Sequence, residues 1–392
     1  MLQDLERESQ LLYSVARPRV TDAELRALLD NGINFGKLGL LAERERATVP
    51  LWQRLASMND ASLPDEASHL QTMAMVSEFR LLHLRQLLVD TLDLLSEKGI
   101  EALLLKGAGL AVSVYPRFID RPMWDLDILV PSDRAQEAWD TMVDQGWQPA
   151  PVGAAEGFYG THHHHLPPLD DPKNVGCVLE IHRELLPGDS PFGFAAADFW
   201  PEASSIRFEG HDVRIPRLSH QIIHLSTHFA WSHMMDSAGW RTFRDLAWIV
   251  DSGKVDWDEV VEFALRTRSG TCCYWTLRLA RTMVHVTIPD AVLTSLKPPG
   301  GEWRLARLEK AFALSLFPYS DRRCPSVALF RLLWRMGIRP VWSGHTGNTP
   351  WDIVELGGAD MGTGMGQRSS VWDQIRRFPQ WMRFASAALR SG

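Results

Sequence analysis

The stretch Leu103–Val130, LLLKGAGLAVSVYPRFIDRPMWDLDILV, decides how this chain folds. Residues 103–105 form a short apolar run that predicts a buried strand, and residues 108–115 predict a helix. Lys106 and Gly107 stand between the two. Glycine lets a ligand approach the backbone closely, and the free N–H groups of a helix start beside a lysine indicate an anion site.

The second half of this stretch supplies negative charge. Residues 124–130, WDLDILV, alternate as a strand does. This alternation places Asp125 and Asp127 on one face, about 6.6 Å apart along the chain. Two carboxylates this close repel each other unless a cation lies between them, and hard oxygen ligands suit Mg²⁺. An anion site beside a divalent-metal site predicts chemistry on a nucleoside triphosphate.

The same residues resemble the nucleotidyltransferase superfamily with the DNA polymerase β-like fold, and within it an uncharacterised bacterial branch written LKG…R…DIDLLV. The matching segments are LLLKGAGL, YPRFIDRP and DLDILV, followed downstream by LSHQIIHLSTHFAW and RDLAWIVDSGKVDWDEVV. The resemblance covers roughly residues 30–285. Lys-Gly replaces the Gly-Ser or Gly-Gly usual after the first strand, and the interval from Gly107 to Asp125 is longer than in the best-known members.

The resemblance implies an α+β fold, a polymerase β-like nucleotidyltransferase mixed sheet flanked by helices, with N-terminal and C-terminal helical domains. Hydrophobic spacing agrees with this, since residues 66–98 predict one long helix and residues 178–182 a strand. Residues 151–175, rich in proline, glycine and histidine, are expected to be a loop. We expect an N-terminal helical segment at 1–65, a nucleotidyltransferase domain at 66–217, a helical domain at 218–335 including a helical stretch at 302–335, and a Gly-rich linker with a tail helix at 336–392.

Further site residues follow from the resemblance. The superfamily brings a third carboxylate on a strand beside the Asp-x-Asp strand, and Glu180 in VLEIH is the candidate, either to bind a metal or to take the proton of the acceptor hydroxyl. Arg121 either reaches the phosphates or pairs with Asp120 or Asp125. The expected catalytic and metal-binding residues are Asp125, Asp127 and Glu180, and the expected nucleotide-binding residues are Lys106, Gly107 and Arg121.

Histidines gather in two places. In the run His162–His165, consecutive residues are expected not to face one ion together, so a lid or substrate-facing loop is preferred over a transition-metal site. His220, His224 and His228 follow at intervals of four along one helix face, which suits a metal row, an acceptor pocket or plain packing. The residues proposed for an acceptor pocket are His164, His165, His182, His224 and His228.

The composition of the chain restricts its possible partners and its location. The chain has 392 residues, 41 basic against 48 acidic side chains and a net charge of −7, which gives no electrostatic case for holding long nucleic acid. Four cysteines without CxxC spacing suggest reduced thiols. The N-terminus does not read as a signal peptide and no apolar run reaches the length of a membrane span. We therefore expect a cytoplasmic protein without a membrane partner.

Together these features predict an enzyme, a nucleotidyltransferase. It would move a nucleoside monophosphate from an NTP, with ATP assumed for its abundance, to a hydroxyl or phosphate of an acceptor, and release pyrophosphate with Mg²⁺ or Mn²⁺ as cofactor. The sequence identifies neither the acceptor, whether small molecule, sugar or peptide, nor the oligomeric state. Two alternatives stay open: a non-catalytic nucleotide-binding or scaffold and antitoxin-type protein, and a histidine-based metal-dependent hydrolase.

Overall fold

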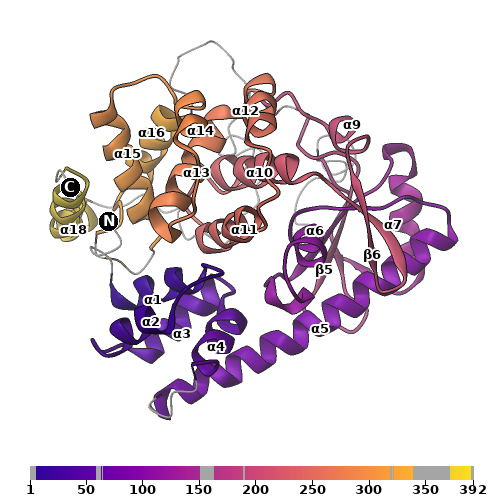
Figure 1. Cartoon of the computed structure of the whole chain (residues 1–392), viewed down its shortest axis with the longest axis horizontal. Coiled ribbons are helices and arrows are strands. Elements are labelled where there is room, and N and C mark those ends of the chain that lie inside the picture. The colour runs from indigo at the N-terminus through magenta and orange to yellow at the C-terminus, as the bar shows by residue number, and fades with distance from the viewer. Residues whose placement is uncertain are drawn as a thin grey trace. The chain divides into compact units, whose positions relative to one another are not determined.

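The computed structural model describes residues 6–58, 63, 65–150, 163–188, 190–317, 320, 322–338 and 371–389. The chain divides into two compact units. We call residues 34–224 with 251–256 the sheet unit, and residues 1–33, 225–250 and 257–392 the helical unit. Within the described residues the fold is α+β, with a mixed seven-stranded sheet and helices before and after it in the chain (Figure 1), which confirms the expected fold class.

The strands of the sheet unit lie in the order β3-β4-β5-β2-β1-β7-β6. The central strand β2 pairs in parallel with β5 and antiparallel with β1, and β1 pairs in parallel with β7. The outer pairs are antiparallel. The strands are β1 (Leu103–Leu104), β2 (Asp125–Leu129), β3 (Gln148–Pro149), β4 (Leu169–Asp170), β5 (Val178–His182), β6 (Ser204–Phe208) and β7 (His211–Ile215).

The long helix α5 (Ser68–Glu97) dominates the helical part of the sheet unit (Figure 1). Its leucines recur at helical spacing, so one face is apolar along the part that meets the sheet. The other helices and helical turns of this unit are α3 (Phe35–Arg44), α4 (Thr48–Ala56), η2 (Asp65–Ala67), α6 (Lys106–Ser113), η3 (Phe118–Asp120), η4 (Ser132–Arg134), α7 (Ala135–Asp144), α9 (Ala196–Phe199) and most of α10 (Leu218–Thr227).

The helical unit contains α1 and the helices after α10. Its second helix begins with a capping box, in which Thr21 and Glu24 each bond to the other's backbone N–H group. The elements are α1 (Arg7–Val15), α2 (Asp22–Leu29), the π-helical turn η5 (His228–Ser232), α11 (Gly239–Asp251), α12 (Trp257–Arg266), α13 (Gly270–Val284), α14 (Asp290–Ser295), α15 (Glu302–Ser315), α16 (Val327–Ile338) and α18 (Val371–Leu389).

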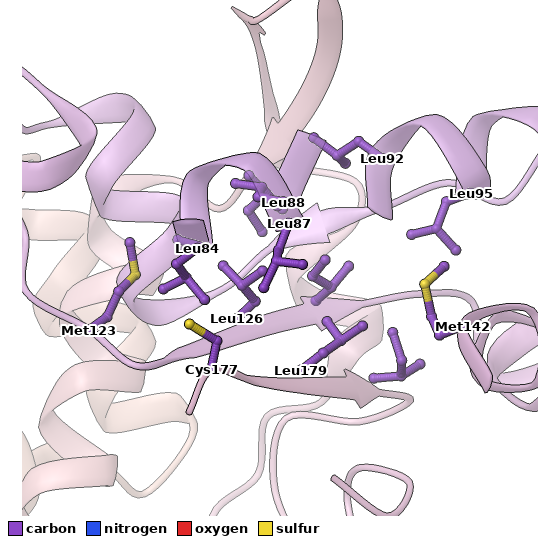
Figure 2. Packing of buried hydrophobic residues seen from close by; sticks show 14 of the residues in the cluster. Leu84, Leu87, Leu88, Leu92, Leu95, Met123, Leu126, Met142, Cys177 and Leu179 are labelled. Carbon is purple, nitrogen blue, oxygen red and sulfur yellow. The ribbon is translucent and has the colours of Figure 1, made fainter. Parts of the chain in front are cut away.

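The core of the sheet unit lies between α5 and one face of the sheet. Figure 2 shows Leu84 and Leu88 of α5 on the same side as Leu126 of β2 and Leu179 of β5, all of them buried. Burying a leucine completely contributes about 2 kcal/mol relative to leaving it exposed. Because side chains alternate along a strand, the residues next to Leu126 in β2 and next to Leu179 in β5 point to the other face of the sheet. The candidate site lies on that face.

Several sequence expectations change in detail. Residues 151–175 are not all loop, because the short strand β4 pairs with β3 and β5 there. The single helical stretch expected at 302–335 is two helices, α15 and α16. Residues 34–58, expected in an N-terminal segment, cluster with the sheet unit, while the expected domain boundaries stay a prediction. The Gly-rich segment at 357–366 lies outside the described residues.

A search of the described residues for membrane-spanning helices finds none of sufficient length and apolar character.

Candidate functional site

The acidic residues expected in the site lie on one face of the sheet, where β2 and β5 run side by side. The parallel register places Asp127 directly opposite Glu180. Alternation along each strand then puts Asp125 on the face of Asp127, and His182 on the face of Glu180. The structure therefore brings the three expected carboxylates to one surface of two neighbouring strands.

Asp127 is the most buried of the three carboxylates, with 3% of its side chain exposed. Lys106 Nζ lies 2.6 Å from its Oδ1 atom, and His182 Nε2 lies 2.9 Å from the same oxygen. Burial alone would raise the pKa of Asp127, but the charges and hydrogen bonds of Lys106 and His182 hold it well below its ordinary value. Asp127 is therefore ionised at neutral pH and already binds two cationic groups.

The two partners of Asp127 titrate in the matching direction. Burial would lower the pKa of Lys106, yet the nearby charges of Asp127 and Glu180 raise it. Burial would likewise lower the pKa of His182, and its hydrogen bonds to Asp127 and Glu180 raise it. The site thus favours the ionised form of its carboxylates and the protonated form of Lys106 and His182.

Glu180 is more open than Asp127, with 21% of its side chain exposed. Its Oε2 atom lies 3.3 Å from His182 Nε2 and 3.7 Å from His165 Nε2. Burial would raise the pKa of Glu180, but the hydrogen bond from His182 lowers it. The carboxylate is therefore ionised at neutral pH and able to accept a proton or bind a cation.

Asp125 lies at the start of β2 and stands apart from this cluster. Its side chain is 44% exposed, and Oδ1 lies 3.7 Å from Arg46 Nη1. Arg46 comes from the segment between α3 and α4, which the sequence did not indicate as part of a site. Asp125 thus shares a face with Asp127 but has a separate cationic neighbour.

Lys106 and Gly107 open α6, as the sequence predicts for the junction after β1. Lys106 has a positive φ of 40°, which is uncommon for a residue with a side chain, and it directs its ammonium to Asp127. A Cβ atom built on Gly107 would lie 2.4 Å from Arg121 Nη1. The side-chain space at Gly107 is therefore filled by Arg121, and binding of a nucleotide by Gly107 stays a prediction.

Arg121 is buried between η3 and β2. Its Nη1 donates to the carbonyl oxygen of Pro122 at 3.1 Å. Its neighbour Asp120 pairs with Arg117, at 2.6 Å between Nη2 and Oδ1. The described contacts thus tie Arg121 to Gly107 and Pro122, and its role toward phosphates also stays a prediction.

Three histidines of the run converge beside the strands. His163, His164 and His165 each offer one ring nitrogen, and these atoms lie within 4.8 Å of one another. These three ring nitrogens are close enough to share one ion, whereas the expectation that the whole run of four does not face one ion together stays a prediction. His162 lies outside the described residues.

The same three histidines are neutral at pH 7. Burial lowers the pKa of His163 to about 3 and that of His165 to about 4, and it also lowers the pKa of His164. The Nδ1 atom of His165 lies 2.6 Å from the carbonyl oxygen of Leu166 and carries the proton, which leaves Nε2 as the acceptor nitrogen facing Glu180.

Of the residues expected to line an acceptor pocket, the structure brings His164, His165 and His182 together. The rings of His164 and His165 have their centroids 5.3 and 5.1 Å from that of His182. His224 is also in the sheet unit, and burial, with further lowering by Lys106 and His182, brings its pKa to about 3. His228 belongs to the helical unit, where its ring meets His233 edge-on.

The helix row at 220, 224 and 228 shows packing rather than a ligand set. His220 stacks on Phe199 with ring centroids 4.9 Å apart, and His224 meets the same ring edge-on. Within the part of the chain that the structure describes, the groups that could hold a metal ion do not include this row.

One such group does lie in the candidate site. One oxygen each from Asp127 and Glu180 and one nitrogen of His182 lie within 4.8 Å of one another. Two carboxylates suit Mg²⁺ or Mn²⁺, and an imidazole ligand favours Mn²⁺. These residues fit a divalent cation on two conditions: Lys106 and the cation share the charge of Asp127, and His182 gives up the proton on Nε2, because an imidazole nitrogen binds a metal only when it carries no proton.

Sequence reasoning missed three residues near Asp125. The guanidinium carbons of Arg46 and Arg80 lie 4.4 and 4.7 Å from the centroid of the Trp124 indole. Trp124 directly precedes the Asp-x-Asp strand, which is a local signal. Arg46 and Arg80 come from α3–α4 and α5, so only the tertiary fold brings them to the strand.

Comparison with known proteins adds the family. A family model described as an uncharacterised nucleotidyltransferase matches residues 31–285, more than half of the chain. No curated protein and no solved structure matches the chain. The matched range contains the helix start at Lys106, the Asp-x-Asp strand and the Glu180 strand. The chain belongs to this family of uncharacterised nucleotidyltransferases.

Proposed function

We propose that this protein transfers a nucleoside monophosphate from an NTP to a hydroxyl or phosphate oxygen of an acceptor. The observation that supports this most directly is the register of β2 and β5, which sets Asp127 opposite Glu180 with Lys106 at 2.6 Å from Asp127. A pair of carboxylates with a lysine beside it suits a triphosphate with its divalent cation, and family membership supports nucleotidyl transfer in general.

The residues divide the work by their charge and exposure. Asp127, Glu180 and Asp125 would hold the divalent cation, Mg²⁺ or Mn²⁺, which neutralises phosphate charge when bound. Lys106, which pairs with Asp127, would also interact with the triphosphate, since its long side chain can reach either group. Glu180, ionised and partly exposed, would accept the proton of the acceptor hydroxyl.

The reaction balances with these groups. The acceptor oxygen forms a bond to the α-phosphorus, and the bond from that phosphorus to the bridging oxygen breaks. Pyrophosphate leaves with the electron pair, and the acceptor proton passes to Glu180. Positioning and charge neutralisation supply most of the rate enhancement in such phosphoryl chemistry.

Calorimetric titration with the four NTPs, in the presence and absence of Mg²⁺, tests this proposal. We expect wild type to bind one NTP in a Mg²⁺-dependent manner, and a double variant Asp125→Asn, Asp127→Asn to lose that binding. A matched double variant at exposed acids, Asp133→Asn with Asp140→Asn, removes the same charge away from the site and should bind as wild type does.

The Asp127→Asn change also leaves Lys106 facing a neutral amide, so folding of the double variant is checked by circular dichroism. Asp125→Asn alone avoids that problem, because Asp125 is 44% exposed. Absence of NTP binding by folded wild type at millimolar nucleotide would count against the proposal and favour a non-catalytic role.

A further inference from the structure

A second cavity opens beside the start of β2, entirely within the sheet unit. It has a volume of about 310 Å³, and its lining includes Arg46, Thr48, Ser77, Arg80 and Trp124. Apolar side chains of α5 form the rest of one wall. A cavity of this size has room for a small charged group together with part of the molecule that carries it.

Two guanidinium groups lie at this cavity with few polar contacts of their own. Arg80 Nε is buried without a hydrogen-bond partner, and the Arg80 guanidinium rests on the Trp124 ring. The nearest ionic partner of Arg46 is Asp125, at 3.7 Å, which is longer than a hydrogen bond. Stacking on Trp124 fixes both groups while leaving most of their N–H donors available.

The charged residues that line the cavity are two arginines, Arg46 and Arg80, and one glutamate, Glu43. The guanidinium carbons of Arg46 and Arg80 lie 4.4 and 4.7 Å from the centroid of the same Trp124 ring, so two positive charges lie close together. These charges repel each other, and the carboxylates of exposed Glu43 and of Asp125, whose side chain is 44% exposed, offset only part of that repulsion because solvent screens them. An anion in the cavity would relieve it.

The backbone at Arg46 adopts a conformation that is unfavourable for a residue with a side chain. The α3 helix ends in a Schellman motif, in which Ala47 N–H donates to Ala42 O and Arg46 N–H donates to Glu43 O. Arg46 occupies the left-handed position of that motif, with φ of 58°. Glycine is the usual residue there, because a side chain strains this conformation.

A second arginine provides a matched comparison. Helix α12 ends in the same motif, since Ser269 N–H donates to Ala264 O and Arg268 N–H donates to Leu265 O. Arg268 has φ of 61° and is exposed. The two arginines therefore share a backbone conformation and differ in that only Arg46 lines the cavity.

We propose that this cavity is a phosphate-binding subsite, in which Arg46 and Arg80 hold a phosphate group next to Asp125. Guanidinium groups match phosphate oxygens in geometry and charge. The phosphate belongs either to the NTP or to a phosphorylated acceptor, and this assignment of its source rests on the proposed function, whereas the binding itself does not.

Calorimetric titration with inorganic pyrophosphate in metal-free buffer containing EDTA tests the subsite. Without a divalent cation, the carboxylates on β2 and β5 repel a polyanion. Pyrophosphate binding under these conditions is therefore attributed to Arg46 and Arg80. We expect wild type to bind pyrophosphate and Arg46→Gly and Arg80→Gln each to weaken binding about tenfold or more. Arg268→Gly should bind as wild type does.

The glycine variants also separate binding from folding. Arg46→Gly should melt at the same temperature as wild type or higher, because glycine removes the strain of the left-handed position, and Arg268→Gly should behave alike. Loss of pyrophosphate binding without loss of stability is the expected pattern. Pyrophosphate binding by Arg46→Gly and Arg80→Gln that equals wild type, or no binding by wild type, would overturn the proposal.

Asp125→Asn distinguishes this subsite from the catalytic proposal. It should weaken Mg²⁺-dependent NTP binding, yet strengthen metal-free pyrophosphate binding, because Arg46 loses a competing carboxylate. Titration of Arg46→Gly with the NTP and Mg²⁺ then identifies the source: weaker binding assigns the phosphate to the NTP, and unchanged binding assigns it to the acceptor. If no NTP binds wild type but the pyrophosphate results hold, only the proposed catalysis fails.

Discussion

At Asp127 one carboxylate oxygen meets both a lysine and a histidine in a nearly solvent-free position. The ammonium of Lys106 at 2.6 Å is the closer partner, and its charge is the largest influence that opposes burial on the pKa of Asp127. A buried ion pair of this kind adds little net stability, but removing one partner leaves the other charge buried without compensation. The stability of variants of this ion pair is therefore a sensitive test of the contacts in the site.

We expect Lys106→Met to lower the free energy of unfolding by about 3 kcal/mol at pH 7, because Asp127 stays buried with His182 as its remaining partner on that oxygen. In wild type the depressed pKa of Asp127 contributes stability above pH 3.9, which is lost as pH falls through the folded pKa. In the variant only His182 opposes the effect of burial, so we expect the pKa of Asp127 to be higher than in wild type. The carboxyl then takes up a proton at higher pH, and the difference from wild type should shrink between pH 7 and pH 4.

Urea denaturation at several pH values measures this, with Lys98→Met as a control because Lys98 is exposed at the end of α5. A penalty for Lys106→Met that stays constant from pH 7 to pH 4 would contradict the assignment of Asp127 as its partner. The sequence predicts that Lys106 and Asp127 belong to one site. It does not predict their direct contact, which depends on the antiparallel pairing of β1 with β2.

At the scale of elements, the start of α6 is packed through its glycines. A Cβ atom on Gly109 would lie 2.5 Å from the carbonyl oxygen of Leu104, a backbone atom of β1 that cannot move aside. The corresponding contact of Gly107 is with the flexible end of Arg121. Gly109 thus lets α6 lie close to the strand that precedes it, and Gly107 leaves room for Arg121.

We expect Gly109→Ala to destabilise the sheet unit by about 1 to 3 kcal/mol, because an added methyl group forces the helix away from β1. Chemical denaturation followed by circular dichroism measures the loss. Gly188→Ala is the control, since nothing lies within 4 Å of a Cβ atom at that position. Equal stability of the two variants would show that α6 shifts freely, which the close packing described here does not allow.

Sequence patterns predict most strands and helices of the sheet unit, but they do not predict which elements contact each other. The strand expected at 178–182 is β5 with the same bounds, and the long helix expected at 66–98 is α5 at Ser68–Glu97. Strand β4 has two residues in a proline-rich segment, too few for a periodic pattern. The contact of Arg46 and Arg80 with Trp124 joins segments far apart in sequence, so no local signal predicts it.

At the scale of the whole molecule, the candidate residues are concentrated in the sheet unit. Asp125, Asp127, Glu180 and Lys106 belong to it, as does the cavity lined by Arg46. The helical unit holds a core of its own, in which Trp275 donates to the carbonyl oxygen of Gly337. A ligand at the strands should therefore affect the two units unequally.

A ligand that binds only the folded state stabilises it by about 2.7 kcal/mol when its concentration is 100 times its Kd. We expect the bound NTP with Mg²⁺ to slow amide hydrogen exchange in β2, in β5 and at the start of α6, where backbone groups adjoin the candidate ligands. The slowing in α13 of the helical unit should be smaller, because α13 contributes none of the candidate ligands. Hydrogen exchange followed by mass spectrometry resolves these segments.

Two conditions make this whole-molecule prediction specific. Chelation of the divalent cation should abolish the slowing, since Asp125, Asp127 and Glu180 repel a triphosphate without it. The corresponding nucleoside at equal concentration, which lacks phosphates, should have no effect on β2. Slowing confined to α13, or slowing that the nucleoside reproduces, would place the ligand away from the strands and would argue against Asp127 and Glu180 as the nucleotide site.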